Sequence, residues 1–539
     1  MLTRRQFLAT SLAVGATAVL AGCTPAAPQT ASPSQLTFGN RLAIPPLLEP
    51  TTSASGDPVY ELTAQEGESM LLPGKSTPSR GFNGSYLGPT IRAKRGDVVR
   101  MKVSNQLKDE TTVHWHGMIL PGEMDGGPHQ MIPAGGIWEP TWTVDQSAAT
   151  LWYHPHVHGT TALQVYSGLS GLFLIDDDEA ANGLPSVYGV DDVPLIIQDK
   201  AFDDAGAMIT GDGKIGGGSD FGILGNTILV NGTFDPYFEA TTTMVRFRVL
   251  NGSNTRFYHL EWSDGREFQV VGNDAGLLNS EVPVKRVSIS PGERLEIVVS
   301  FTAGEEVLLR SATGENGVID DGEFDILKVR AAAQLSASPA HAEVLAALAP
   351  IAPTAGARER FFSLGETTIN GKEMDMNRID SVVGAGAVEI WSVANDSYAH
   401  NFHIHGAVFT ILDRDGEAPD PVEAGHKDTV FIPECTSVRL AVAFADYPDP
   451  SAPYMYHCHL LRHEDMGLMA QFVLVESGQE EVQKQALGVS EDDQNSRSEE
   501  WDNDENTDDW NGDESSDESD DDENSNESDQ SDQSGGMAH

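Results

Sequence analysis

The chain has 539 residues, with 33 Lys and Arg against 82 Asp and Glu, and carries a formal net charge of −49. This acidity excludes nucleic acid as a partner, because phosphate binding requires a basic surface. The length is sufficient for three domains of ordinary size with additional segments. The three cysteines, at positions 23, 435 and 458, are too few for a disulfide framework.

The N-terminus has the features of an export signal. Arg4 and Arg5 precede an apolar run that ends in Leu-Ala-Gly directly before Cys23. A basic start, a short apolar stretch and small residues at its end indicate a secretory signal rather than a membrane span. The arginine pair resembles a twin-arginine signal, and the residues around Cys23 resemble a lipoprotein cleavage box.

We therefore expect residues 1–23 to direct the chain to the twin-arginine export machinery. Cys23 then becomes the first mature residue and carries a lipid, which is the expected membrane contact. The exported protein is anchored to the outer face of the cytoplasmic membrane, in a periplasmic or extracellular location. Residues 24–36 are rich in Pro, Ser, Thr and Ala and form a flexible linker.

Residues 37–180 contain short β-rich runs, such as Val98–Val103, separated by turn residues. This pattern predicts a Greek-key sandwich. Two histidine motifs lie within it, the pair His114 and His116 and the pair His154 and His156. Each His-x-His pair places two imidazoles on the same face of a strand, as a metal site requires.

The β-rich pattern recurs in residues 190–332, but the histidine motifs do not. The single histidine of this segment, His259, is expected to be structural. We interpret the segment as a spacer domain that holds its neighbours at a fixed distance. Residues 333–357, which are rich in Ala, follow as a linker or a short helix.

Residues 358–478 are predicted to form the last sandwich. They contain His400, His403 and His405, and then Cys458 between two histidines, with His463 five positions later. In a strand, Cys458 faces one side while the flanking imidazoles face the other. Two metal sites would then be joined by a covalent path through the cysteine.

A soft thiolate with two imidazoles and a weak or missing axial ligand is typical of a blue-copper site. The alternative, a buried free cysteine near chance histidines, is disfavoured because the other motifs supply the missing ligands. Cys435 has no evident partner, and we interpret it as a core thiol. Residues 479–539 are dominated by Asp, Glu, Ser and Asn, which predicts a disordered, solubilising tail rather than a regulatory or metal-gathering one.

The four histidine motifs, in this order, resemble those of the multicopper oxidases: His-x-His-Gly, His-x-His, His-x-x-His-x-His and His-Cys-His-x-x-x-His. The resemblance covers residues 37–478 and is nearest to the three-domain bacterial laccases and cuprous oxidases, of which the segment Pro121–Gly127 is typical. It implies an all-β fold of three cupredoxin-like Greek-key β-sandwich domains. It also implies four copper ions per chain, one type 1, one type 2 and two type 3, with no other cofactor.

The resemblance also implies a role for each ligand residue. Type 1 copper is assigned to His400, Cys458 and His463, and type 2 copper to His114 and His403. The type 3 pair is assigned to His116, His154, His156, His405, His457 and His459. His158 lies beyond the motif, and we expect it to support the structure rather than bind metal. His129, His341, His426 and His539 match no motif.

The implied mechanism is one-electron oxidation of a small reductant at type 1 copper and transfer of electrons through Cys458 to His457 and His459. Four electrons then reduce O2 to water. Because this reduction consumes protons, acids are expected near the trinuclear site. Asp125 and Glu464 stand where the bacterial relatives place such carboxylates, and we assign them to a proton relay rather than to plain loop acids.

Two positions differ from the family pattern, and they bear on the type 1 potential and on the substrate. The axial position of type 1 copper is occupied by Leu468, which cannot coordinate, so a raised type 1 potential is expected. Met466 and Met469 flank this position. Tyr398 stands where cuprous oxidases have a methionine, and Met374 and Met376, which we interpret as core residues of a strand, are the only methionines between Gly356 and His400.

These departures favour laccase-like oxidation of phenols, aromatic amines or similar small reductants. The alternative is a metallo-oxidase that acts on Cu(I), or on Mn(II) or Fe(II), in metal detoxification. A non-enzymatic scaffold is disfavoured because the ligand set is complete. A two-domain nitrite reductase is disfavoured because such relatives lack the complete type 3 set.

Overall fold

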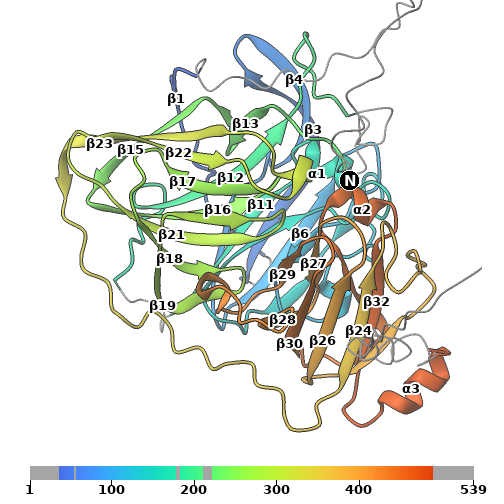
Figure 1. Ribbon diagram of the computed structural model, residues 1–539. Helices are drawn as coiled ribbons and strands as arrows, with labels where there is room; N and C mark the ends of the chain where they lie inside the picture. Colours follow the sequence, from blue (N-terminus) through green and yellow to red (C-terminus); the bar gives the residue numbers. More distant parts are fainter. Residues whose placement is uncertain (1–35, 54–55, 178–182, 211–220, 490–539) are drawn as a thin grey trace, which may run out of the picture. The chain divides into compact units, whose positions relative to one another are not determined.

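The computed structural model describes residues 36–53, 56–177, 183–210 and 221–489 (Figure 1). The strands among these residues form six sheets, which group by sequence into a first, a middle and a last pair. The all-β prediction is confirmed. The expected export signal, the lipidated Cys23 and the linker up to residue 35 lie outside the described residues. No described helix is long and apolar enough to cross a membrane.

The first sandwich consists of two sheets. One has the order β2 (Thr51–Thr52), β3 (Pro58–Leu72), β6 (Val98–Asn105) and β8 (Ile137–Trp138), with β4 (Lys75–Phe82) paired to β3 and β9 (Thr141–Thr143) paired to β6. The other has the order β5 (Ile91–Lys94), β11 (Gly171–Asp176), β10 (Ala149–His154) and β7 (His114–His116). Buried and less buried residues alternate along β6, because successive side chains of a strand point to opposite faces.

The middle sandwich is built in the same way. One sheet has the order β1 (Asn40–Arg41), β15 (Pro236–Thr242), β23 (Phe324–Ser336), β22 (Glu306–Ala312), β17 (Tyr258–Trp262) and β20 (Arg286–Ile289). The other has the order β14 (Thr233–Phe234), β13 (Thr227–Val230), β12 (Asp192–Lys200), β16 (Met244–Asn251), β21 (Arg294–Ser300), β18 (Phe268–Asn273) and β19 (Gly276–Val284). β1, at the start of the expected first domain, therefore pairs with the middle sandwich.

The last sandwich carries the cysteine motif. One sheet has the order β24 (Glu359–Leu364), β26 (Val388–Asn395), β30 (Ser437–Phe444) and β28 (Ala407–Arg414). The other has the order β25 (Ser381–Gly384), β32 (Met469–Val475), β31 (Asp449–Cys458), β27 (His400–Ile404) and β29 (Thr429–Ile432). Its core packs Trp391 against Phe362 and Tyr456, with ring centroids 4.6 and 5.2 Å from that of Trp391.

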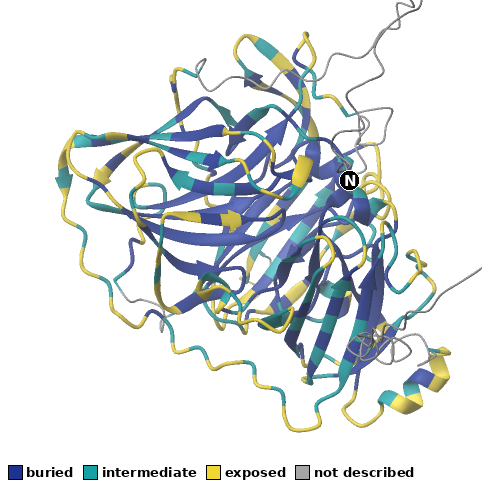
Figure 2. Cartoon of the chain, viewed as in Figure 1, coloured by how far each residue is buried: buried dark blue, intermediate teal, exposed yellow. Residues whose placement is uncertain are grey.

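Each sandwich has its own hydrophobic core. Figure 2 shows the buried residues concentrated in the strands and the exposed residues in the connections. Burial of one Leu or Phe side chain contributes about 1.5–3 kcal/mol, so each core stabilises the strands that carry the histidine motifs. The helices are few and short: α1 (Thr161–Tyr166), α2 (Leu461–Asp465) and α3 (Glu480–Leu487), with 3-10 turns at η3 (Gly122–Met124), η5 (Gly317–Ile319) and η6 (Pro421–Glu423).

Residues 337–358 contain neither helix nor strand and connect β23 to β24. Two details differ from the sequence-based expectations. The expected disordered tail begins with an ordered segment, α3, although residues 490–539 lie outside the described part. The interpretation of Cys435 as a core thiol was wrong, because Cys435 is exposed and occupies a tight turn with a φ of +54°.

Candidate metal centre

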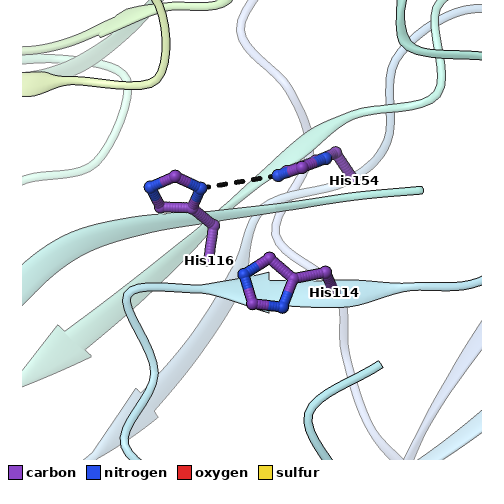
Figure 3. A group of neighbouring side chains, drawn as sticks. All are labelled: His114, His116 and His154. Carbon is purple, nitrogen blue, oxygen red and sulfur yellow. Dashed lines mark hydrogen bonds between the residues drawn. The ribbon is translucent and has the colours of Figure 1, made fainter. Parts of the chain in front are cut away.

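Neighbouring strands of the first sandwich bring its two motifs together. β7 pairs antiparallel with β10 and places His114 opposite His154. Alternate residues of a strand share one face, so His114 and His116 project from the same side of β7. Figure 3 shows these rings beside that of His154, with Nδ1 of His116 lying 3.4 Å from Nε2 of His154.

The last sandwich presents its histidines in a matching way. β27 pairs antiparallel with β31, which places His403 opposite His457 and Phe402 opposite Cys458. Because side chains alternate along β31, Cys458 lies on the other side of the strand from His457. The sheet therefore separates a thiol site from an imidazole cluster.

The imidazole cluster combines the two outer sandwiches. Its members are at most 1% exposed, and they are His114, His116, His154, His156, His403, His405, His457 and His459. His116 stacks on His403 with ring centroids 3.7 Å apart, and His114 stacks on His405 at 3.8 Å. Nε2 of His457 lies 3.1 Å from Nε2 of both His156 and His405. Each stacked pair joins one ring of the first sandwich to one ring of the last.

In two of these rings, a hydrogen bond from Nδ1 to a backbone carbonyl leaves Nε2 as the nitrogen that can bind a metal ion. Nδ1 of His114 donates to the carbonyl of Asp125 at 3.0 Å, and Nδ1 of His403 donates to the carbonyl of Asp428 at 2.8 Å. Their Nε2 atoms are buried and have no hydrogen-bond partner among the described residues. Burial of a nitrogen lone pair costs free energy unless a hydrogen-bond donor or a metal ion interacts with it. The ligand set therefore fits copper, which imidazoles bind well.

Burial also sets the protonation state of the cluster. Desolvation and the neighbouring imidazoles lower the pKa of His116, His154, His156, His403, His405 and His459 well below the usual value. Burial lowers the pKa of His457 to about 3. These rings are neutral at physiological pH, as metal ligation requires.

The thiol site lies on the other side of β31. Sγ of Cys458 is 3.4 Å from Nδ1 of His400 and 3.7 Å from Nδ1 of His463, and the two Nδ1 atoms are 3.1 Å apart. Nε2 of His400 hydrogen-bonds to Ser397, at 2.9 Å from its Oγ, so Nδ1 faces the thiol. Burial raises the pKa of the Cys458 thiol to about 12, so metal binding at this site must release a proton.

Leu468 is fully buried beside the thiol site. Its N–H donates to the carbonyl of His463 at 2.9 Å, and its carbonyl accepts from the N–H of Cys458 at 3.1 Å. The backbone thus fixes Leu468 next to both predicted ligands. An aliphatic side chain at this position supplies no donor atom.

The two predicted relay acids both contact the imidazole cluster. Oδ2 of Asp125 accepts from Nδ1 of His405 at 2.8 Å. The carboxylate of Glu464 lies 3.4 Å from Nδ1 of His156 and 3.3 Å from Nδ1 of His457. Burial raises the pKa of Glu464 well above its usual value, so this side chain can hold a proton at neutral pH.

The structure adds an acid that no sequence motif indicated. Asp428 is fully buried, and its Oδ1 lies 3.1 Å from Nε2 of His116. Its carboxylate is paired with Arg294 of the middle sandwich. The sequence shows only one more acidic residue among 82, because the contact joins positions more than 300 residues apart.

The remaining histidines lie away from both sites. His158 is exposed and belongs to none of the ligand groups found among the described residues. His259 bonds to Ser288 and Asp320, which is consistent with a structural role. Among the other described histidines, His129 hydrogen-bonds to Gln471, His341 to Glu281 and His426 to the carbonyl of Ala349. His539 lies outside the described residues.

Two aromatic rings lie against the thiol site. The ring centroid of Phe221, from the middle region, is 5.0 Å from that of Tyr398 and 5.7 Å from that of His463. Tyr398 is itself 5.7 Å from His463. Phe221 and Tyr398 are both half-buried, so they form the accessible border of this site.

A loop with two methionines is hydrogen-bonded to the segment that follows His463. Met374 and Met376 are half-buried and lie in the loop between β24 and β25, not in a strand as expected. The N–H of Met374 donates to the carbonyl of Gly467 at 2.9 Å. Met466, next to this glycine, is 44% exposed.

Comparison with known proteins gives consistent results. Residues 63–180 and 349–478 match two family profiles, both described as multicopper oxidase. The chain is 35% identical to the multicopper oxidase mco of Staphylococcus aureus over 80% of this chain and 92% of that protein. It is 37% identical to the cell division protein FtsP of Salmonella typhimurium over 88% of this chain and 98% of that protein.

Solved structures show the same relationship. The laccase of Pediococcus acidilactici superposes with a TM-score of 0.74 and 34% identity, over 81% of this chain and 94% of that one. A multicopper oxidase of Campylobacter jejuni, described as a metallo-oxidase, superposes with a TM-score of 0.72 and 28% identity, over 82% of this chain and 97% of that one.

Proposed function

Because the chain belongs to the multicopper oxidase family, we propose that it is an exported laccase-like oxidase that oxidises phenolic or similar small reductants. As a member of that family it is a copper-binding oxidoreductase that uses O2 and a reducing substrate. The proposal specifies the substrate, the four copper ions and the role of each ligand residue.

The thiol site is the proposed type 1 position, held by His400, Cys458 and His463. The proposed type 2 ligands are His114 and His403, whose Nε2 atoms lack partners among the described residues. The proposed type 3 ligands are the other six members of the cluster: His116, His154, His156, His405, His457 and His459. When bound, copper supplies the one-electron redox chemistry.

The chain's own residues provide the remaining functions. The peptide bonds from Cys458 to His457 and His459 form a short covalent path between the two sites. Complete burial of the cluster excludes bulk water from it. Asp125 and Glu464 are placed to supply protons to oxygen as it is reduced, since each carboxylate contacts a predicted type 3 ring.

The observation that carries the substrate proposal is the contact of Phe221 and Tyr398 with His463. Aromatic rings favour edge-to-face and offset contacts with other aromatic rings, at centroid distances of about 4.5–7 Å. A phenol bound at this border would lie beside a predicted type 1 ligand. Cu(I) would instead favour thioether ligands, and Tyr398 provides none.

The metallo-oxidase alternative also has a specific observation in its favour. The loop with Met374 and Met376 is hydrogen-bonded to Gly467, beside the exposed Met466. Thioether sulfurs are soft ligands that suit Cu(I). Oxidation of Cu(I), or of Mn(II) or Fe(II), therefore remains the second candidate function.

A scaffold role without chemistry is a weaker candidate. The relative FtsP bears the name of a cell division protein. In this chain, however, all of the predicted ligands are buried and lie in the thiol site or in the imidazole cluster. A protein with only a scaffold role would have no reason to bury several imidazole nitrogens that have no hydrogen-bond partner among the described residues.

Export and lipid anchoring at Cys23 complete the proposal. They rest on the sequence of residues 1–23, which lie outside the described residues. Labelling of cells with a radioactive fatty acid should mark the wild-type protein and not the Cys23→Ala variant. Label on that variant would contradict the lipid anchor.

The experiment that tests the substrate is oxygen uptake by the copper-loaded chain. Phenolic donors and Cu(I) are compared side by side over a salt series, with Cys458→Ser as the control that should abolish both activities. Faster turnover of phenols supports the laccase proposal. Faster turnover of Cu(I) by a wide margin supports the metallo-oxidase and assigns the role to the methionine loop.

A further inference from the structure

Two aspartates bracket the imidazole cluster in corresponding ways. Asp125, in the first sandwich, accepts from His114 of its own sandwich through its carbonyl, at 3.0 Å. It accepts from His405 of the last sandwich through its carboxylate, at 2.8 Å. The two rings that it holds stack on each other at 3.8 Å.

Asp428 repeats this arrangement with the roles of the first and last sandwiches exchanged. Its carbonyl accepts from His403 of its own sandwich at 2.8 Å, and its carboxylate accepts from Nε2 of His116 of the first sandwich at 3.1 Å. These two rings stack at 3.7 Å. The site thus has an approximate two-fold relationship, with one aspartate for each stacked pair.

The two aspartates differ in their charge partners. Among the described residues, no Lys or Arg ion pair involves Asp125, and its Oδ1 has no hydrogen-bond partner. Asp428 is paired with Arg294, which contacts both carboxylate oxygens. Arg294 and Asp428 are both fully buried.

Arg294 uses all five N–H groups of its guanidinium. Two donate to the Asp428 carboxylate, and the others donate to the carbonyls of Thr150 at 3.0 Å, Gly292 at 2.9 Å and Asp274 at 2.9 Å. Thr150 belongs to β10, the strand that also carries His154. One side chain of the middle sandwich therefore contacts the first and last sandwiches at the same time.

The orientation of His116 depends on this arrangement. His114, His154, His403, His405 and His457 each direct Nδ1 to an oxygen outside the cluster. His116 instead directs Nε2 outward to Asp428, and its Nδ1 faces His154 inside the cluster. An acceptor at Nε2 fixes the tautomer whose Nδ1 lone pair faces inward.

We propose that Arg294 and Asp428 are a positioning pair, through which the middle sandwich fixes the ring and tautomer of His116 for copper binding. The inference rests on the proposed function, because His116 is a proposed type 3 ligand. The bidentate contact with Arg294 holds the carboxylate in one orientation, with Oδ1 lying 3.1 Å from Nε2 of His116. Oδ1 also accepts from the hydroxyl of Thr429 at 2.9 Å, and that hydroxyl lies 3.2 Å from the same Nε2. The middle sandwich is therefore part of the metal centre and more than a spacer.

The test is the Asp428→Asn variant. Its amide has the same shape, but in either orientation the NH2 group faces a donor of Arg294, and in one orientation it also faces the N–H of His116. The matched control is Glu389→Gln, which neutralises the carboxylate of a buried pair with Arg360, 2.6 Å apart. Within the described part of the chain, this carboxylate has no hydrogen bond or ion pair with a histidine.

Copper retention is measured by chelator competition, together with the type 2 electron paramagnetic resonance signal, the blue absorption of the thiol site and the melting of the copper-free form. Loss of an outer partner of a metal-ligating histidine weakens metal affinity about 10- to 100-fold. We expect this loss at the cluster for Asp428→Asn, with the blue absorption retained, and no loss for Glu389→Gln. Arg294→Lys, which keeps the charge but not the paired donors, should fall between the two.

Equal copper retention in Asp428→Asn and Glu389→Gln would overturn the proposal. If Asp428→Asn does not fold without copper, Arg294→Lys decides the question by the same comparison. Wild-type protein is measured in parallel. A wild type that binds no copper at the cluster refutes the proposed function itself, whereas a normal wild type with an unaffected Asp428→Asn refutes only the positioning pair.

Discussion

Glu464 extends from α2 of the last sandwich and places a carboxylate oxygen 3.4 Å from Nδ1 of His156, a residue of the first sandwich. The same carboxylate lies beside His457, so it contacts one predicted ligand from each side of the cluster. Burial raises the pKa of Glu464 well above the usual value. It therefore retains a proton as the pH rises to values at which exposed glutamates have lost theirs.

The first prediction concerns this proton. Glu464→Gln keeps the shape but removes the exchangeable proton, so turnover should fall about 100-fold, as for loss of a general acid. In the wild type, activity should decline as the pH rises through the raised pKa and Glu464 loses its proton. That decline should disappear in the variant. Steady-state oxygen uptake over a pH series measures both effects.

Asp125→Asn is the companion variant, because Asp125 contacts the cluster at a different ring, that of His405. It should also slow oxygen reduction. If both variants keep the wild-type rate and pH profile, neither acid belongs to a proton relay.

The second prediction concerns Leu468. Leu468→Met introduces a thioether beside the thiol site, which should stabilise Cu(II) and lower the type 1 potential. A redox titration followed through the blue absorption measures the change. Leu461→Met is the control, because Leu461 is equally buried but packs against α1 instead. An unchanged potential in Leu468→Met would show that Leu468 is not the axial residue.

The third prediction concerns specificity. Tyr398→Met removes an edge-to-face contact with Phe221 and adds a thioether near His463. Such ring contacts contribute about 0.5–1.5 kcal/mol, so kcat/KM for phenols should fall about 2- to 10-fold while Cu(I) oxidation rises. Tyr398→Phe, which keeps the ring, should retain phenol oxidation. Parallel losses for both donors would mean that Tyr398 only supports the local fold.

The fourth prediction concerns the copper-free protein. Burial lowers the pKa of four cluster histidines, His116, His154, His403 and His405, well below 6.5 in the folded state, so at acid pH the unfolded chain binds more protons than the folded one. The free energy of unfolding should therefore fall as the pH drops from about 7 to about 5, by as much as about 1.4 kcal/mol per pH unit for each histidine. Urea unfolding at several pH values measures this slope.

The matched variant for this experiment is His154→Leu, which removes one buried imidazole. Its slope should be smaller than that of the wild type. An identical slope would show that ionisation of the cluster does not govern the acid sensitivity of the fold.

The fifth prediction concerns Lys200 in the middle sandwich. Its side chain is buried 4.0 Å above the ring of Tyr166, and burial lowers its pKa to about 7. Since the unfolded value is about 10.4, proton uptake below about pH 10 favours unfolding. Lys200→Met should therefore raise the free energy of unfolding at neutral pH, on the order of 2 kcal/mol. A lower stability would show that the contact with Tyr166 outweighs desolvation.

The sequence was sufficient to predict candidate ligand residues because each histidine motif is local. Alternation along a strand also determines that Cys458 faces away from His457. The pairing of β27 with β31 joins residues far apart in the sequence and is seen only in the structure. Short β-rich runs between turns were likewise sufficient for the all-β class.

Other features depend on contacts between distant residues. Asp428 and Arg294 are 134 positions apart, and neither stands in a recognisable motif. Cys435 has no evident partner in the sequence and was therefore interpreted as a core thiol, but the turn with positive φ exposes it. Met374 and Met376 lie in a loop because their environment is set by Gly467 and Gln471, nearly 100 positions further along the chain.

The contacts of Arg294 have a consequence for how the protein matures. A chain whose middle sandwich has not yet docked lacks the guanidinium that orients Asp428, so His116 is not held in the ligand tautomer. In such an intermediate the imidazoles are not yet held together, so copper has no complete ligand set to bind. Metal loading at the cluster then reports the completion of folding, and redox activity arises only in molecules whose three parts have already assembled.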